Sequence, residues 1–149
     1  MYYKAVAKNR KAFHNYFIEE TLEAGMVLVG SEVKSLRAGQ VSIVEAHIII
    51  RDNEVFLLNA HITEYKFATY DKQNPIRERK LLLHKREIKK LKVKITREGY
   101  TAIPLKIYFK GNHAKVEIGI AKGKHNYDKR ATLKAKTQNR EINRAMKNY

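Results

Sequence analysis

The clearest hydrophobic pattern in the chain runs from residue 105 to residue 120. Between 105 and 110, large apolar residues alternate with lysine and tyrosine, and between 115 and 120 valine and isoleucine alternate with polar residues or glycine. The dipeptide Gly111-Asn112 separates the two runs. Because alternation with a period of two is typical of strands that bury one face, we expect an antiparallel hairpin here. Its solvated face would carry Lys106, Tyr108, Lys110 and Lys115.

Shorter apolar runs predict further strands. Ala46–Arg51 and Glu54–His61 flank Asp52-Asn53, a two-residue signal for a hairpin turn. The segment Phe13–Val29 is interpreted as two strands, or as one long strand kinked near Gly25. Pro104 fits the start of a strand, an edge or a bulge.

Two segments have helical character. Ser31 can cap a short helix that continues through Arg37 and ends at Gly39, with Val33 and Leu36 facing inward. Within 81–98, Ile88, Leu91 and Ile95 are three and four residues apart and so share one helical face. Gly99 follows where a helix C-cap is expected.

These elements predict a mainly β fold of about six short, mostly antiparallel strands with two or three helices. A small closed or partly open β-barrel would leave few strand edges exposed. Residues 1–11 are polar and basic, and we expect them to be mobile until a partner binds. The segment 63–80 lacks periodicity, and a loop of that length is usually functional or mobile.

The chain changes character at Ala121–Arg130. From Lys122 to Tyr149, nine basic residues stand against two acidic ones. We therefore divide the chain into a folded body, 1–121, and a basic tail, 122–149. On a helix, one side of the tail would be basic and the other mostly alanine, which predicts a tail that is disordered when free and helical when bound to phosphates. The basic side comprises Lys129, Lys136, Arg140, Arg144 and Lys147.

The formal net charge of +16 favours an anionic partner: a nucleic acid, a membrane surface or an acidic protein. The tail offers only Leu133, Ile142 and Met146 for insertion into lipid, so nucleic acid is favoured and no membrane partner is expected. Cysteine is absent and the six histidines lack metal-ligand spacing, so we expect neither a metal nor another cofactor. No apolar run resembles a signal peptide or membrane span, and the cytoplasm is the expected location.

Catalytic patterns are weak. Gly119–His125 resembles a phosphate-binding loop, but it is one residue short and has histidine where serine or threonine would hold magnesium. The three serines lack the setting of a nucleophile elbow, and Glu19, Glu20 and Glu23 are expected to pair with lysine or arginine. We therefore expect no enzymatic activity. Tyr127, which lies among basic residues, is suited to stacking on an unpaired base.

Eight ordered motifs cover nearly the whole chain: Asn9–Ala12, Tyr16–Glu20, Glu23–Gly25, Gly30–Arg37, Arg79–Glu87, Gly99–Thr101, Lys115–Gly119, and Gly123-Lys124 leading to Asp128–Arg130. Together they resemble the SsrA-binding protein family, also called small protein B. The resemblance implies an oligonucleotide-binding-fold barrel with flanking helices and a flexible tail. It also implies binding to the transfer-RNA-like domain of transfer-messenger RNA, and delivery of that RNA to stalled ribosomes in trans-translation.

The resemblance implies further partners. Small-subunit ribosomal RNA would contact the tail, which becomes a helix in the empty messenger channel. Elongation factor Tu and alanyl-tRNA synthetase would be partners indirectly, through the RNA. Such a protein acts as a monomer and catalyses nothing.

Carried over by matching position, the expected RNA-binding residues of the body are Asn9, Glu23, Leu82 and Lys115. The motif expected at the ribosomal decoding centre comprises Gly123, Lys124, Tyr127, Asp128, Lys129 and Arg130. The messenger channel would take Lys136, Arg140, Arg144, Met146 and Lys147. The chain departs from the family pattern at Tyr127, where many members have histidine, and its tail stops soon after Met146.

The residues by themselves leave alternatives open. A ribosomal protein with a basic extension would have a similar charge pattern, and an RNA-processing enzyme would need acids or histidines that converge at one site. Glu23 is unexpected at an RNA surface. It would either accept hydrogen bonds from base edges or 2′-hydroxyls, or orient a neighbouring arginine.

Overall fold

A computed structural model of the protein describes residues 4–64 and 74–124. Within these ranges the chain forms nine strands and three helices. In chain order they are β1 Ala5–Lys8, α1 Arg10–Asn15, β2 Tyr16–Met26, α2 Gly30–Arg37, β3 Val41–Ser42, β4 His47–Arg51, β5 Glu54–Leu58, β6 His61–Ile62, β7 Arg79–Leu82, α3 Lys85–Arg97, β8 Thr101–Lys110 and β9 His113–Gly123.

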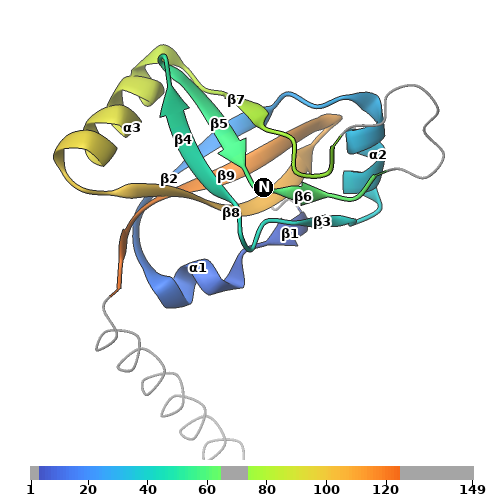
Figure 1. Ribbon diagram of the computed structural model, residues 1–149, viewed down its shortest axis with the longest axis horizontal. Helices are drawn as coiled ribbons and strands as arrows, with labels where there is room; N and C mark the ends of the chain where they lie inside the picture. The colour runs from blue at the N-terminus through green and yellow to red at the C-terminus, as the bar shows by residue number, and fades with distance from the viewer. Residues whose placement is uncertain (1–3, 65–73, 125–149) are drawn as a thin grey trace, which may run out of the picture.

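The main sheet has seven antiparallel strands in the order β1-β8-β9-β2-β7-β5-β4. It curls so that β4 and β5 lie in front of β8 and β9 (Figure 1). The prediction of a mainly β, antiparallel fold is confirmed, but the sheet does not close into a barrel. Its end strands, β1 and β4, share no ladder, because the segment before β4 pairs instead with β6 in a separate two-stranded sheet.

Two apolar clusters hold the fold together. The larger one fills the inside of the curl with side chains from the sheet and from α3, among them Leu57, Leu91, Ile107 and Ile118. The smaller one lies between α1 and the other face of β8 and β9, and it contains Ala12, Ile103, Leu105 and Ala121. Apolar burial on both faces explains why β8 contains so few exposed residues.

The β8–β9 hairpin was predicted in the right place, and Ile107, Val116, Ile118 and Ile120 face the main core as expected, but Leu105 and Tyr108 differ from the prediction. The register shifts between Pro104 and Lys106, so Leu105 is an extra residue in β8. This bulge turns Leu105 toward α1, whereas Ile107 faces the main core. Tyr108, expected on a solvated face, is only 5% exposed.

Both predicted helices exist with shifted starts. Leu91 is fully buried in α3 with Ile88 and Ile95 packed beside it, and Gly99 has a φ of +72°. This helix begins at Lys85 because 79–82 forms β7. In α2 it is the Glu32 carboxylate that accepts the N–H of Val29, at 3.1 Å, so the predicted capping by Ser31 is wrong.

Expectation and structure agree at the 46–61 hairpin and differ in the segments before it. The turn residues Asp52 and Asn53 have φ values of 52° and 61°, which confirms the predicted hairpin. However, part of the 1–11 segment forms β1, which pairs with β8. Phe13–Val29 contributes the end of α1 and one long strand, β2, and its last residues, 27–29, are not in a strand.

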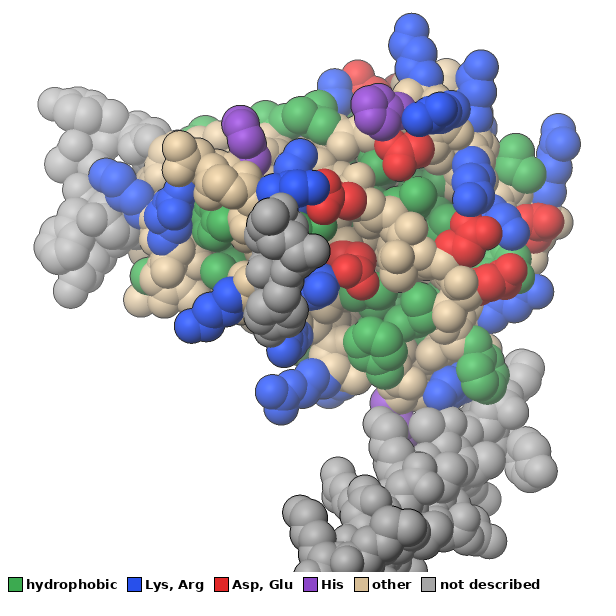
Figure 2. All heavy atoms as spheres, turned by 180° about the vertical axis from the view of Figure 1, so that it is seen from behind, with side chains coloured by type: hydrophobic (Ala, Val, Ile, Leu, Met, Phe, Trp, Pro, Cys, Tyr) green, Lys and Arg blue, Asp and Glu red, His purple; other side chains and the backbone are tan. Residues whose placement is uncertain are grey.

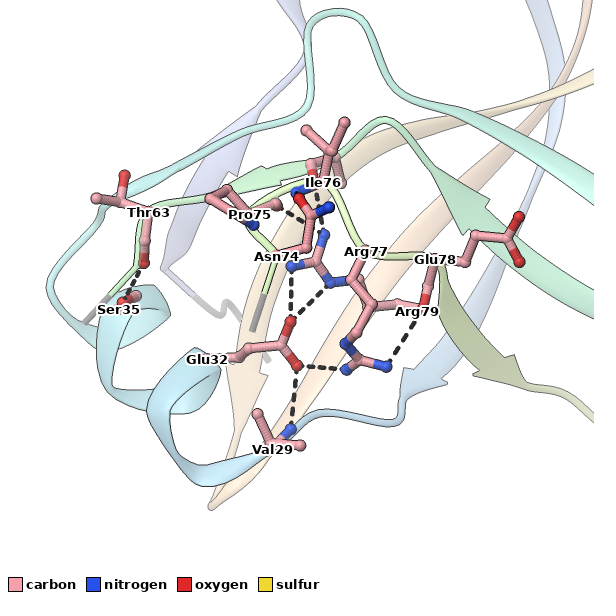
Figure 3. Close-up of polar contacts among 11 residues, drawn as sticks. Val29, Glu32, Ser35, Thr63, Asn74, Pro75, Ile76, Arg77, Glu78 and Arg79 are labelled. Atoms are coloured by element: carbon pink, nitrogen blue, oxygen red, sulfur yellow. Dashed lines mark hydrogen bonds and ion pairs between the residues drawn. The ribbon is translucent and has the colours of Figure 1, made fainter. Parts of the chain in front are cut away.

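A buried ionic network joins α2 to the start of β7 (Figure 3). The Glu32 carboxylate, 4% exposed, accepts hydrogen bonds from Arg77 at 2.5 Å and from the fully buried Arg79 at 2.6 Å. Arg79 also donates to the carbonyl oxygens of Ala60 and Pro75. Since the network joins α2, the loop before β6 and the loop before β7, it sets the position of β7 and hence of Leu82 at its end.

Candidate nucleic-acid interface

A surface pocket of about 380 Å³ lies where β2, β7 and β9 run side by side. Gly25 in β2 pairs with Leu82 in β7 on one side and with Lys115 in β9 on the other. The pocket brings together three of the four expected RNA-binding residues of the body. Its lining includes Glu23, Gly25, Leu82, His84, Glu87 and Lys115.

Gly25 gives the pocket its depth. A Cβ atom at this position would come within 3.5 Å of the Leu82 side chain and 3.7 Å of the Lys115 Nζ atom. Leu82 is 54% exposed, so its side chain is accessible to a ligand in the pocket. An exposed leucine beside an ammonium group suits a nucleotide, whose sugar and base offer apolar surface and whose phosphate is anionic.

The two lysines beside Glu23 differ in their contact with its carboxylate. Within the described part of the chain, Lys115 forms no ion pair, whereas Lys110 lies 3.5 Å from the Glu23 carboxylate. The hydroxyl of Tyr108 donates a hydrogen bond to Glu23. This bond, together with Lys110 and Lys115, lowers the pKa of Glu23 despite some desolvation, so the carboxylate is charged at neutral pH. Among the described residues its neighbours are thus a tyrosine and lysines, and none of them is the arginine of the second alternative.

The N-terminus of α3 forms another wall of the pocket. Its capping box pairs His84 with Glu87, whose carboxylate accepts the His84 N–H at 3.1 Å. Sequence reasoning missed Gly25, His84 and Glu87 as pocket residues. A glycine inside a long strand was the available signal, since it often marks a place where another group approaches closely.

Asn9, the fourth expected RNA-binding residue, is buried, with 5% exposure, and does not line the Lys115 pocket. Its backbone N–H donates to the carbonyl oxygen of Leu105 at 2.8 Å, and its Nδ2 atom donates to that of Pro104 at 3.0 Å. Asn9 therefore fixes the corner between β1 and α1 against the bulge in β8.

Gly123 and Lys124 lie at the opposite end of the β2–β9 ladder. Gly123 pairs with Tyr16, and the Lys124 backbone N–H donates to the Asn15 carbonyl oxygen at 2.8 Å. About 3.3 Å of strand per residue places this end roughly 25 Å from Lys115. β9 thus continues past the predicted domain boundary at 121. The remaining predicted ribosome-binding residues, Tyr127 to Lys147, lie outside the described residues.

Among the described residues, the other acids and histidines form no second cluster of this kind. Glu20 pairs with Lys90 at 2.7 Å and Glu19 approaches Lys94 at 4.0 Å, as predicted for these acids. Over residues 4–64 and 74–124, no group of three potential metal ligands comes together. No helix in the same ranges is long and apolar enough to cross a membrane.

The face of the molecule seen from behind is rimmed by lysine and arginine side chains, with acidic side chains lying among them (Figure 2). A surface on which both signs are mixed but positive charge dominates attracts a polyanion and still discriminates among its local structures. The charge of the whole chain supports this interpretation.

Comparisons with known proteins agree with this surface. A model of the SmpB protein family matches residues 6–148. The SsrA-binding protein of Limosilactobacillus reuteri is 52% identical over 97% of this chain and 92% of its own, and that of Geobacter metallireducens is 52% identical over 97% and 94%. A solved structure described as "tmRNA-SmpB: a journey to the center of the bacterial ribosome" is 47% identical, with a TM-score of 0.66 over 80% of this chain and 84% of that one. The chain therefore belongs to the SmpB family of SsrA-binding proteins.

Proposed function

We propose that this protein binds the transfer-RNA-like domain of transfer-messenger RNA and delivers it to stalled ribosomes for trans-translation. The observation that carries the proposal is the clustering of Glu23, Leu82 and Lys115 in one pocket of a chain that belongs to this family. These residues come from three strands and meet only in the folded protein.

Each pocket residue has a chemical role in the proposed complex. Lys115 neutralises a backbone phosphate, and Leu82 packs against a ribose or the face of a base. Glu23 is ionised and already held by Tyr108, so it is oriented to accept hydrogen bonds from a 2′-hydroxyl or an exocyclic amino group. The Glu23 carboxylate also repels any RNA whose backbone phosphate would lie beside it, and this repulsion contributes specificity.

The other end of the β2–β9 ladder leads to the ribosome-binding part of the chain. There Gly123 and Lys124 begin the motif that continues through Tyr127, Asp128, Lys129 and Arg130 to the ribosomal decoding centre. Residues beyond it, including Arg140, Arg144 and Met146, enter the empty messenger channel as a helix. Elongation factor Tu and alanyl-tRNA synthetase meet the protein only through the RNA.

We also propose that the protein acts by binding, without catalysis, and as a monomer. The curled sheet is taken to be an open variant of the oligonucleotide-binding fold, because β4 and β5 fold back across β8 without pairing to β1. Asn9 supports binding indirectly, through the shape of the β1–α1 corner.

Direct binding to a synthetic transfer-RNA-like domain tests the proposal. The full chain should bind this RNA more tightly than a hairpin RNA of equal length at the same salt concentration. Equal affinity for both RNAs would refute specific recognition. Ribosome sedimentation separates the alternative of a structural ribosomal protein, which would stay on the subunits through a high-salt wash that removes a rescue factor.

A further inference from the structure

Helix α3 carries seven basic residues and one acid within its 13 residues. Leu91 is fully buried, and Ile88 and Ile95 pack beside it against the main core. Because one side of the helix is packed in this way, the basic side chains lie on its two flanks and its outer side. Figure 2 shows lysine and arginine side chains standing out at its upper right edge, which is the edge where α3 lies. The contacts of these side chains decide which of them can bind a partner.

The flank of α3 that faces β2 is neutralised. Lys90 pairs with Glu20 at 2.7 Å. Lys94 pairs with Glu98 at 3.2 Å and approaches Glu19 at 4.0 Å. Exposed ion pairs of this kind contribute little to stability, but the acids cancel most of the positive field on this side of the helix. This flank is therefore a weak attractor for an anion.

The first two turns of α3 carry three exposed cations, Lys85, Arg86 and Lys89. In the part of the chain that the structure describes, no ion pair includes any of the three. Glu87 lies between them in sequence, but its carboxylate accepts the backbone N–H of His84 in the capping box. On an α-helix the three cations fall within an arc of about 100°. They therefore form one positively charged surface, here called the α3 cation cluster.

A hollow of about 260 Å³ lies beside this cluster, between α3 and the turn that joins β4 to β5. It is lined by Asn53, Lys85, Ile88, Lys89 and Lys92. The Lys92 ammonium donates a hydrogen bond to the Asn53 side-chain oxygen at 3.2 Å, so Lys92 is held against the turn. Lys85 and Lys89 remain beside the apolar side chain of Ile88. Ammonium groups next to an apolar surface suit a ribose-phosphate chain, in which anionic groups alternate with sugars.

The first turn of α3 connects the cluster to the Lys115 pocket. His84 and Glu87 line that pocket, whereas the residues that follow them, Lys85 and Ile88, line the hollow. The cluster itself spans four residue steps, which is about 6 Å along the helix axis. A single RNA that enters the Lys115 pocket therefore reaches the cluster without a change in the shape of the protein.

We propose that the α3 cation cluster holds the backbone of a base-paired stem of the transfer-RNA-like domain, beside the nucleotide that occupies the Lys115 pocket. This proposal rests on the proposed function and adds a second contact of a different kind. No aromatic side chain lines the hollow, so it offers nothing on which an unpaired base would stack. In a stem the bases are turned inward and the phosphates outward, and cations alone suffice to bind it without reading its sequence.

The first test compares two double variants of the full chain. Lys85→Ala with Lys89→Ala removes two cations of the cluster. Lys90→Ala with Lys92→Ala removes the same charge from the same helix, at lysines that Glu20 and Asn53 engage. For a synthetic transfer-RNA-like domain, the slope of log affinity against log salt should become shallower by about 0.9 for each lost phosphate contact, hence by up to about 1.8 in the first variant. The control should change it much less, and both should melt at the temperature of the unaltered chain.

An unchanged slope in the cluster variant would overturn the proposal. An equal change in both double variants would overturn it too, because it would reflect the net charge of the helix alone. If the unaltered chain bound the transfer-RNA-like domain no better than a hairpin RNA, the proposed function itself would be wrong. Specific binding by the unaltered chain with an unchanged slope in the cluster variant would reject only the stem contact.

Directed cleavage identifies the RNA segment that meets the cluster. The chain has no cysteine, so Lys89→Cys provides a single attachment site for an iron chelate that generates hydroxyl radicals. In the complex with the transfer-RNA-like domain, both strands of one stem should be cut. Cuts confined to unpaired loops would overturn the assignment to a stem. Cuts in ribosomal RNA or in a ribosomal protein, but not in this domain, when stalled ribosomes are added would overturn the choice of partner.

Discussion

The hydroxyl of Tyr108 in β8 donates a hydrogen bond to the Glu23 carboxylate in β2, across the intervening strand β9. Tyr108 is almost completely buried, whereas Glu23 is exposed. The bond therefore fixes an acid of the proposed RNA-binding surface to a side chain anchored in the sheet. An oriented acceptor at an RNA surface distinguishes partners that can donate a hydrogen bond from those that cannot.

Tyr108→Phe removes this anchor. The pKa of Glu23 should rise toward the ordinary glutamate value, because the first cause of its lowering is the tyrosine hydrogen bond, although Lys110 and Lys115 remain. The free energy of unfolding should fall by about 1 kcal/mol, the usual net value of one hydrogen bond. Carboxyl NMR titration and urea unfolding measure the two effects. An unchanged Glu23 pKa would contradict the assigned contact.

Lys115→Ala should weaken binding to the transfer-RNA-like domain. If Lys115 neutralises one phosphate, the slope of log affinity against log salt should become shallower by about 0.9 or less. Lys92→Ala is a matched control, since Lys92 lies on α3 and contacts Asn53 away from the pocket. A filter-binding series in which both variants showed the same slope as the unaltered chain would place the phosphate contact elsewhere.

Gly25→Ala should lower the affinity for RNA and leave the stability of the protein nearly unchanged. The new Cβ atom would make ordinary contacts of 3.5 Å with Leu82 and 3.7 Å with Lys115, so the strand tolerates it. Reduced freedom of the unfolded chain offsets any strain, and we expect a stability change within about 1 kcal/mol. RNA affinity should fall because the methyl group fills the pocket floor. Unchanged affinity would mean that RNA does not enter the pocket.

Glu32→Ala should be the most damaging of these substitutions. It leaves the fully buried Arg79 without its counter-charge, which typically costs about 3–5 kcal/mol. Leu82 would lose its fixed position as β7 loosens, so RNA binding should weaken together with stability. Thermal unfolding of the variant beside Glu54→Ala, whose ion pair with Lys80 is exposed, provides the comparison.

The same network predicts a pH dependence. Burial opposes ionisation of Glu32, but hydrogen bonds from Arg77, Val29 and Arg79 outweigh it and lower its pKa below 4.5. A lowered acid pKa contributes stability above the unfolded value, and that stability is lost as the pH falls through the folded value. Melting temperatures between about pH 2 and pH 6 should therefore fall less steeply for Glu32→Gln than for the unaltered chain.

The strongest sequence patterns predicted the elements and most of their buried faces, but they did not reveal the irregularity in β8. Ile88, Leu91 and Ile95 located α3, and Asp52-Asn53 located a hairpin, because both signals are local. The bulge at Leu105 is not local: it allows β8 to contact α1 on one face and the main core on the other. Tyr108 is buried where β8 pairs with β1 on one side and β9 on the other, and alternation alone could not reveal that β1 would be there.

The candidate site also depends on contacts that local sequence does not reveal. Glu23, Leu82 and Lys115 were found by resemblance to a family, and nothing in their local sequence places them together. Pairing of β2 with both β7 and β9 does so. That Asn9 contacts RNA stays a prediction; its hydrogen bonds to Pro104 and Leu105 bury most of the side chain against β8. A polar side chain that bonds to the backbone of a distant strand cannot be distinguished by sequence from one that faces solvent.

Removal of the tail tests most directly whether the folded body binds the RNA and the tail engages the ribosome. A chain that ends at Lys124 keeps all of β9 and its contacts with α1. Compared with the full chain, it should bind the transfer-RNA-like domain with similar affinity at a salt concentration that suppresses non-specific attraction, and it should support no tagging on stalled ribosomes. Loss of specific RNA binding on truncation, or tagging at the level of the full chain, would contradict the account.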